Sequence, residues 1–182
     1  LLLDHIGSDQ PQDYLAGFPS HPHRGFSTFT YMIDGYMTHH DSMGNNGELG
    51  PGSAQWMKAA SGVIHSEMPK QQFGLMRGFQ LWINLPAVNK MDRPEYMEYT
   101  EEMFPVVKFP NYTVKVLVGH FDGIDAPIID SVTEVTYLDV QLQPKKDFRY
   151  DLPKGNSNFI YVFEGYGTLA GQAVSHHSLA IP

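Results

Sequence analysis

The 182-residue sequence contains no cysteine. This absence excludes disulfide bonds, a thiolate nucleophile and zinc held by cysteine. The sequence also has no apolar run near the roughly 20 residues that a membrane-spanning helix needs, and no secretory signal is visible. We therefore expect no membrane partner and a cytoplasmic protein, or a nuclear one if the source is a eukaryote.

Positive charge is scarce. Twelve lysines and arginines stand against twenty acidic residues, which gives a formal net charge of −8, and the basic residues form no run. Proteins that bind nucleic acid normally present a basic face, so the composition argues against direct contact with DNA or RNA. An acidic surface remains compatible with a protein partner.

The sequence also lacks the pattern of a long amphipathic helix. Its 17 glycines and 13 prolines favour short strands joined by turns. Residues Phe26 to Ile33 (FSTFTYMI) alternate in the manner of a half-buried strand. Further strands are predicted at Ser53–Ala59, Gly62–Met68, Gly78–Leu85, Thr113–Val118, Thr133–Leu142 and Asn158–Phe163. The charged segment Pro86–Phe104 is interpreted as a connector with a short helical turn. The prediction is an all-β fold, as a barrel or a sandwich.

An internal repeat supports two copies of one barrel. HPHRGFSTFTYMIDG, which begins at residue 21, aligns without a gap on DLPKGNSNFIYVFEG, which begins at residue 151. Identical residues occupy the positions of Gly25 and Gly155, Ser27 and Ser157, Phe29 and Phe159, Tyr31 and Tyr161, and Gly35 and Gly165. His21 and His23 align with Asp151 and Pro153, so a metal site in the first copy would have lost both ligands in the second.

Two pairs of residues with the spacing i, i+2 are candidate metal ligands. His21 and His23 flank Pro22, which stiffens the pair, and His65 and Glu67 repeat the spacing farther on. Residues i and i+2 of a strand project to the same face, so two adjacent strands would bring the four side chains to one point. Three imidazoles and a carboxylate suit Fe(II), and also Mn, Co, Ni, Cu or Zn. The alternative is that these are unrelated histidines, one on a loop and one in a strand.

The motifs also carry a family resemblance. GFPSHPHRGFSTFTYMIDG, HHDSMGNNGELGPGSAQWMKAASGVIHSEM and GFQLWINLP closely resemble the pirin family of the cupin superfamily. The resemblance implies a bicupin, in which residues 1–100 form an N-terminal barrel with one metal, usually iron, and residues 101–182 form a metal-free C-terminal barrel. Its ligands map onto His21, His23, His65 and Glu67.

The sequence departs from the pirin pattern in two places. Ser27 stands where most pirins have a glutamate, which we expect to spare the metal while altering the surroundings of its ligands. Pirins also continue for several strands and a helix beyond the point where this sequence stops. We therefore expect the second barrel to be incomplete, with unpaired edges, and the natural polypeptide to be longer.

The resemblance implies a function as well. Some pirins resemble flavonol 2,4-dioxygenases (quercetinases), which implies a monomeric, metal-dependent dioxygenase that cleaves a flavonol, a small aromatic substrate, with O₂. The metal would bind the 3-hydroxyl oxygen, and Glu67 would remove its proton as the general base. The alternative is a non-catalytic, iron-dependent regulatory protein that acts on transcription or metabolism through protein partners.

Other polar and sulfur-containing residues receive structural interpretations. His39 and His40 are interpreted as part of a solvated turn, although the His-x-Asp-Ser pattern typical of pirins implies that His39 supports the site. Met32 and Met37 are predicted to pack in the core. Arg24 is predicted to pair with a carboxylate.

Overall fold

The computed structural model describes residues 1–153 and 155–182, so Lys154 lies outside the described residues. The chain divides into two compact units, Leu1–Gln143 and Pro144–Pro182. Within the described ranges no helix combines the length and the apolar character needed to cross a membrane.

The regular elements of both units are mostly strands. The first unit contains β1 (Leu2–Ser8), α1 (Pro11–Tyr14), β2 (Phe18–His23), β3 (Phe26–Asp34), β4 (Met37–Asp41), β5 (Asn46–Leu49), β6 (Ala54–Lys58), β7 (Val63–Pro69), β8 (Met76–Asn84), η1 (Ala87–Asn89), β9 (Glu95–Tyr99), η2 (Glu101–Met103), β10 (Val106–Lys108), β11 (Tyr112–Val118), β12 (His120–Phe121), β13 (Ile124–Asp125) and β14 (Tyr137–Leu142). The second unit contains β15 (Ile160–Val162), β16 (Tyr166–Leu169), β17 (Gln172–Ser175) and β18 (Ser178–Ala180). The all-β prediction is confirmed.

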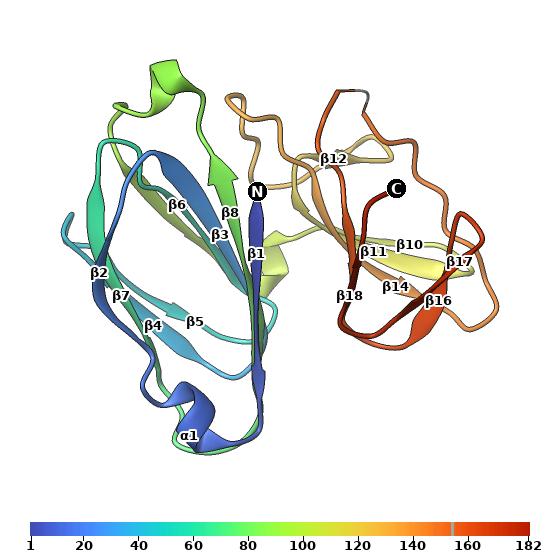
Figure 1. The fold of residues 1–182 in the computed structure, drawn as a ribbon, viewed down its shortest axis with the longest axis horizontal. Helices are drawn as coiled ribbons and strands as arrows, with labels where there is room; N and C mark the ends of the chain where they lie inside the picture. Colours follow the sequence, from blue (N-terminus) through green and yellow to red (C-terminus); the bar gives the residue numbers. More distant parts are fainter. Residues whose placement is uncertain (154) are drawn as a thin grey trace. The chain divides into compact units, whose positions relative to one another are not determined.

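Two antiparallel sheets form the first part of the chain (Figure 1). One has the strand order β1-β8-β3-β6-β9 and the other the order β2-β7-β4-β5. Side chains of the two sheets meet, because Gln80 on β8 and Gln55 on β6 both donate hydrogen bonds to Glu67 on β7. The predicted site residues therefore lie between the two sheets.

Strand β3 is buried on both faces. Its residues alternate between the interior of the two-sheet layer and a second apolar layer. On the second side, Phe29 meets Tyr137 edge to face at 5.2 Å, and the Tyr31 hydroxyl donates to Asp139 at 3.0 Å. The double burial explains why residues 27–32 are all buried although their sequence alternates.

A methionine-rich cluster fills one end of the layer. Met32 and Met37 pack with the buried side chains of Tyr14, Leu49 and Met76. The core prediction for the two methionines is confirmed. Unbranched thioether side chains suit this position, because they fill the irregular space between short strands and a four-residue helix.

The interpretation of Pro86–Phe104 as a connector is wrong in part. The segment has the predicted helical turns, η1 and η2, but also β9, which pairs with β6 at the edge of the five-stranded sheet. Tyr96 packs inward against Met57 while Glu95 is exposed. Charged residues are common on exposed sheet edges, and here they obscured the strand pattern.

The strand predicted at Thr133–Leu142 begins only at Tyr137. Before it, the Asp130 carboxylate accepts hydrogen bonds from the backbone N–H groups of Val132 and Thr133, which stabilises a turn. In the second unit the described strands form two ladders, β15 with β18 and β16 with β17. The predicted strand Asn158–Phe163 is thus confirmed only for its central residues.

Replacing Met32 with alanine tests the core cluster. The side chain is fully buried, so Met32→Ala should lower the free energy of unfolding by about 2–5 kcal/mol through lost burial and a cavity. Urea unfolding of the metal-free protein measures this change. Met43→Ala, at an exposed methionine, is the matched control and should change it by less than about 0.5 kcal/mol. Equal effects of the two substitutions would contradict the assignment of the core.

Candidate metal centre

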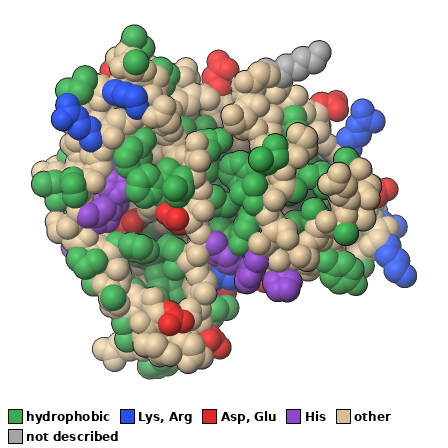
Figure 2. All heavy atoms as spheres, in the orientation of Figure 1, with side chains coloured by type: hydrophobic (Ala, Val, Ile, Leu, Met, Phe, Trp, Pro, Cys, Tyr) green, Lys and Arg blue, Asp and Glu red, His purple; other side chains and the backbone are tan. Residues whose placement is uncertain are grey.

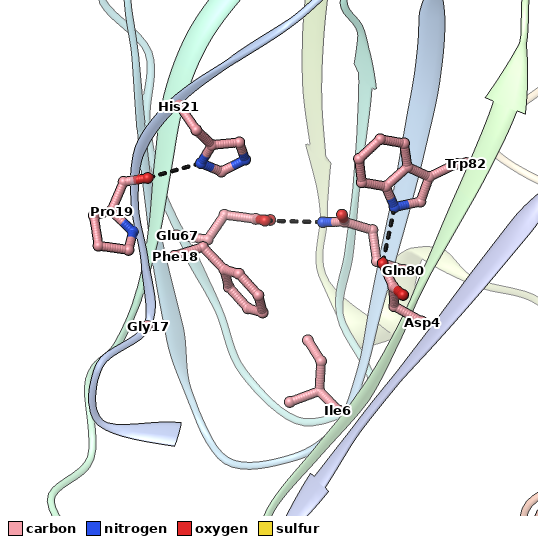
Figure 3. Close-up of a pocket in the computed structure, with 9 residues that line it drawn as sticks. All are labelled: Asp4, Ile6, Gly17, Phe18, Pro19, His21, Glu67, Gln80 and Trp82. Atoms are coloured by element: carbon pink, nitrogen blue, oxygen red, sulfur yellow. Dashed lines mark hydrogen bonds between the residues drawn. The ribbon is translucent and has the colours of Figure 1, made fainter. Parts of the chain in front are cut away.

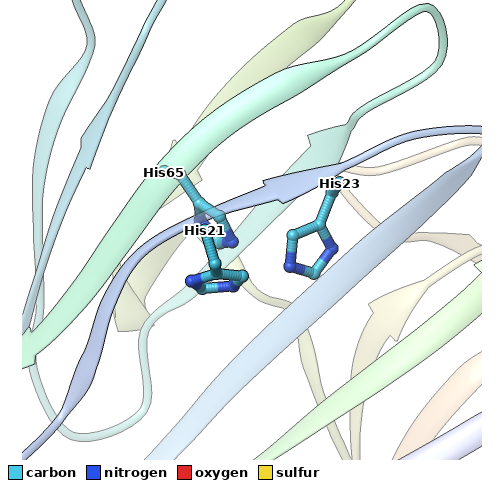
Figure 4. Close-up of side chains that lie close together, drawn as sticks. All are labelled: His21, His23 and His65. Atoms are coloured by element: carbon cyan, nitrogen blue, oxygen red, sulfur yellow. The ribbon is translucent and has the colours of Figure 1, made fainter.

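Strands β2 and β7 bring three histidines together. The two strands pair antiparallel with His21 directly opposite His65, and His23 follows on the same face of β2. The ring centroids are 4.7 Å apart for His21 and His23, 4.4 Å for His21 and His65, and 4.6 Å for His23 and His65 (Figure 4). Nitrogen atoms of all three rings lie within 4.8 Å of one another, a geometry that suits one metal ion.

A glycine allows this approach of β2 to β7. Gly17 has a φ of +57°, and a Cβ atom there would lie 2.8 Å from Met68 Sδ and 3.0 Å from the Glu67 carbonyl oxygen. The pairing is irregular between Phe18 and His21, where the register shifts. The chain thus enters β2 close to β7 and then turns both histidines toward His65.

Glu67 is the fourth predicted ligand and is only 2% exposed. Its Oε1 accepts hydrogen bonds from Gln55 Nε2 at 2.5 Å and Thr30 Oγ1 at 3.3 Å, and its Oε2 accepts one from Gln80 Nε2 at 2.8 Å. Its carboxylate oxygens group with His65 and with His39, within 4.8 Å of their ring nitrogens. His65 is therefore the residue shared by the imidazole cluster and the carboxylate.

Burial sets the protonation of these groups. It lowers the pKa of His65 to about 3 and that of His23 to about 4, with further lowering by neighbouring histidines. Both rings are thus neutral near pH 7 and keep a lone pair for a metal. Burial also raises the pKa of Glu67, although hydrogen bonds from Gln80, Thr30 and Gln55 and the charge of His21 oppose it.

The donor atoms fit a metal ion. His21 Nδ1 lies 2.7 Å from the Pro19 carbonyl oxygen, so it carries the proton and leaves Nε2 with the lone pair. Among the described residues, His65 Nε2 and His23 Nδ1 are buried without a hydrogen-bond partner. Buried polar atoms are rarely left so, and in this cluster a divalent cation of borderline softness would satisfy them.

A cavity of about 380 Å³ opens beside the cluster (Figure 3). Its lining consists of Asp4, Ile6, Gly17, Phe18, Pro19, His21, Glu67, Gln80 and Trp82. Phe18 and Trp82 project into it from opposite sides, and the Trp82 indole N–H donates to Asp4 at 3.1 Å. The indole stacks on Phe26 with ring centroids 4.7 Å apart, which fixes this wall. Histidine side chains also reach the surface beside hydrophobic ones on the left of Figure 2.

The solvated-turn interpretation is wrong for His39, which is 1% exposed on β4 and lies directly opposite Glu67 across the β4–β7 pair. Its ring stacks on Tyr96 at 4.2 Å, and its Nε2 donates to Asp41 at 3.2 Å. His40, which points away, is exposed. The alternation in MTHHD was the available signal, since it places the two histidines on opposite faces of one strand.

The structure corrects the expectation for Ser27. This residue is opposite Ile83 and Lys58, so it lies on the face of β3 that points away from Thr30 and the histidines. It is buried, and its Oγ finds no partner among the described residues. The serine therefore does not alter the surroundings of the proposed ligands.

The structure also corrects the prediction for Arg24. Its guanidinium donates to Met91 Sδ at 3.2 Å, and it takes part in none of the ion pairs among the described residues. The predicted partner carboxylate is thus absent from the part of the chain that the structure describes.

Comparison with known proteins identifies relatives. The sequence profile of the Pirin family matches residues 1–83. A Pseudomonas aeruginosa protein, named provisionally as a quercetin 2,3-dioxygenase, is 48% identical over 177 residues, which cover 94% of this chain and 62% of that protein. A pirin-like protein of Caulobacter vibrioides is 44% identical over 176 residues, covering 96% of this chain and 64% of its relative. The chain thus spans less than two thirds of the length of both.

A solved structure shares the fold. The crystal structure of quercetin 2,3-dioxygenase from Acinetobacter baumannii superposes with a TM-score of 0.90 at 28% identity. The superposition covers 100% of this chain and 66% of that one. The arrangement of sheets described above is therefore that of a known fold.

Two substitutions on opposite faces of the five-stranded sheet test the polar interior. Gln80→Leu removes a donor from the buried Glu67 carboxylate and should lower the free energy of unfolding by about 1–3 kcal/mol. Ser27→Ala removes a buried hydroxyl without a described partner and should leave stability unchanged or slightly higher. Urea unfolding in the presence of a chelator measures both. A larger loss for Ser27→Ala than for Gln80→Leu would contradict the assigned faces.

Proposed function

This chain belongs to the pirin family, and from that premise we propose that it is a metal-dependent dioxygenase that cleaves the ring of a flavonol with O₂. One observation carries the proposal: three imidazoles cluster beside a cavity with aromatic walls, and a carboxylate that groups with one of them, His65, also lines that cavity. The A. baumannii protein of the same fold is named as a quercetin 2,3-dioxygenase, which supports the substrate class.

The proposed ligands of a single divalent ion are His21, His23, His65 and Glu67. Iron(II) is the first candidate, and Mn, Co, Ni, Cu and Zn suit the same donors. When bound, such an ion supplies Lewis-acid chemistry for a substrate hydroxyl and redox chemistry for O₂. The neutral state of His23 and His65 and their buried, unpartnered nitrogens support this assignment.

Glu67 is also proposed as the general base. It lines the cavity, so a substrate hydroxyl can approach it. Burial raises its pKa, which makes the carboxylate a stronger proton acceptor than an exposed glutamate. Oε1 accepts hydrogen bonds from Gln55 and Thr30, whereas Oε2 accepts one from Gln80 and so retains capacity for another.

The cavity walls favour a flat, uncharged aromatic ligand. Phe18 and Trp82 offer ring surfaces on opposite sides, which suits a planar ring system. Asp4 and Glu67 are the charged residues of the described lining, which holds no lysine or arginine. A ligand with phenolic hydroxyl groups meets these carboxylates as a hydrogen-bond donor, whereas an anionic ligand is repelled.

We retain the domain organisation as part of the proposal. Residues 1–100 would form the metal-binding barrel, and residues 101–182 would belong to a second barrel without a metal. The residues that align with His21 and His23 are an aspartate and a proline, so this segment lacks both imidazoles, which supports the second assignment.

Metal and oxygen measurements test the proposed activity. The protein loaded anaerobically with Fe(II) should bind one ion per chain and consume O₂ when quercetin is added. His65→Ala should lose most of the metal, because this residue is shared by both donor groups. Glu67→Gln should lose O₂ uptake, since an amide cannot accept the hydroxyl proton. His120→Ala, at an exposed histidine paired with Asp125, is the control and should match the wild type.

The outcomes separate the site from the activity. A wild-type protein that binds its full complement of metal but consumes no O₂ with quercetin would contradict the dioxygenase and favour the regulatory alternative. Absence of metal from the wild type would contradict the ligand assignment itself.

Ligand affinity tests the aromatic wall. Phe18→Ala should weaken anaerobic binding of quercetin about threefold to tenfold, because a lost aromatic contact is worth about 0.5–1.5 kcal/mol beyond the buried area. Isothermal titration calorimetry measures the change. Phe73→Ala is the matched control, since Phe73 is 81% exposed and does not line the cavity. Equal affinities of the two variants would place the ligand elsewhere.

A further inference from the structure

We propose that His39 and Asp41 are positioning residues that fix the tautomer and the orientation of His65, so that its Nε2 faces the metal with a lone pair. The inference rests on the proposed metal site and concerns residues outside its ligand set. It depends on a line of three polar side chains on β4 and β7, from Asp41 through His39 to His65.

Asp41 anchors this line. Its Oδ1 accepts hydrogen bonds from the backbone N–H groups of Met43, at 2.9 Å, and Asn45, at 3.0 Å. Its Oδ2 accepts one from the Asn45 amide at 2.9 Å. The carboxylate side chain is fully buried, and the turn that follows β4 holds it in place. It is therefore a fixed acceptor at one end of the line.

His39 transmits this constraint. Its Nε2 lies 3.2 Å from Asp41 Oδ2, and a carboxylate accepts hydrogen bonds, so Nε2 carries the proton. In the neutral ring Nδ1 then holds the lone pair. Stacking on Tyr96 at 4.2 Å, with the rings 13° from parallel, holds the plane of the imidazole, and the hydrogen bond to Asp41 sets which edge of the ring faces His65. The lone pair consequently points toward His65.

His65 receives the constraint. Its Nδ1 is 3.5 Å from His39 Nδ1, which is at the long end for a hydrogen bond. This contact is therefore weak, and its role is to orient the His65 ring rather than to stabilise the fold. Because His39 Nδ1 is an acceptor, His65 Nδ1 must donate, and its proton leaves Nε2 bare. That Nε2 is the buried nitrogen without a partner among the described residues. A carboxylate that orients a metal-ligating histidine directly is common, and here a second histidine stands between them.

A hydrogen bond in the opposite direction, from His39 to His65, gives a distinct prediction. If His39 carried protons on both nitrogens, it would donate to Asp41 and to His65 at once. His65 Nδ1 would then be the acceptor, and its proton would sit on Nε2, where it would block the metal. The two arrangements differ in which nitrogen of His65 is protonated, and NMR can measure this directly.

Long-range ¹H–¹⁵N correlation spectra of the metal-free protein at pH 7 report the tautomer of each histidine. The wild type should show His65 protonated at Nδ1. His39→Phe keeps a ring on Tyr96 but removes the acceptor, so His65 should become a mixture of tautomers, and Co(II) affinity should fall about 10- to 100-fold. His39→Gln supplies an amide oxygen as an acceptor and should restore most of both properties.

His40→Phe is the matched control, because the side chain of His40, next to His39 in the sequence, is exposed. This variant should match the wild type in both measurements. A wild-type His65 protonated at Nε2 would overturn the inference, as would a His39→Phe variant with an unchanged tautomer and affinity. If His39→Phe does not fold, the wild-type spectrum still decides. A wild type that binds no Co(II) would refute the proposed metal site. The tautomer of His65 is measured on the metal-free protein, so it would still decide whether His39 orients His65.

Discussion

The structure of the site depends on one constraint: the Glu67 carboxylate is buried between two sheets and must find hydrogen-bond donors there. A buried charge without partners would cost several kcal/mol. Its donors come from a row that crosses the five-stranded sheet, since Gln55 and Gln80 both lie directly opposite Thr30 on neighbouring strands. The same row continues to Asp4 on β1, which lies directly opposite Gln80 and lines the cavity. One line of polar residues therefore supports the carboxylate and reaches the place where a ligand would enter.

Strand alternation separates this polar interior from the apolar core. Thr28 and Thr30 face the site, whereas Phe29 and Tyr31 face the second layer, where they contact Tyr137 and Asp139. A shift of one residue in β3 would exchange the two faces and place phenyl rings against Glu67. The large apolar residues that fix the register of β3 thereby also fix the donors of the carboxylate.

The sequence predicted those parts of the site whose residues have the regular two-residue spacing of a strand. His21 and His23, and His65 and Glu67, are each two residues apart, and that spacing alone places each pair on one face of a strand. Thr30, Gln55 and Gln80 could not be predicted in this way, because they lie singly on three strands and meet only through the register of the sheet. His39 was misassigned since a histidine pair before Asp-Ser looks like a turn, and only the pairing of β4 with β7 buries it.

The metal-free protein retains features that oppose its own stability. His23 Nδ1 and His65 Nε2 are buried without partners among the described residues, and burial raises the pKa of Glu67. Each of these costs free energy in the absence of a cation, and apolar side chains of similar size would remove the cost. Such local conflicts between sequence and fold concentrate at functional sites. A cation that binds the folded chain and not the unfolded one stabilises it by mass action, so the same atoms that weaken the empty fold would strengthen the loaded one.

The aligned segment at residue 151 has a turn glycine at the same position but no imidazole, so nothing in the repeated pattern itself requires the histidines. Their presence in the first copy is best explained by the ion they would hold.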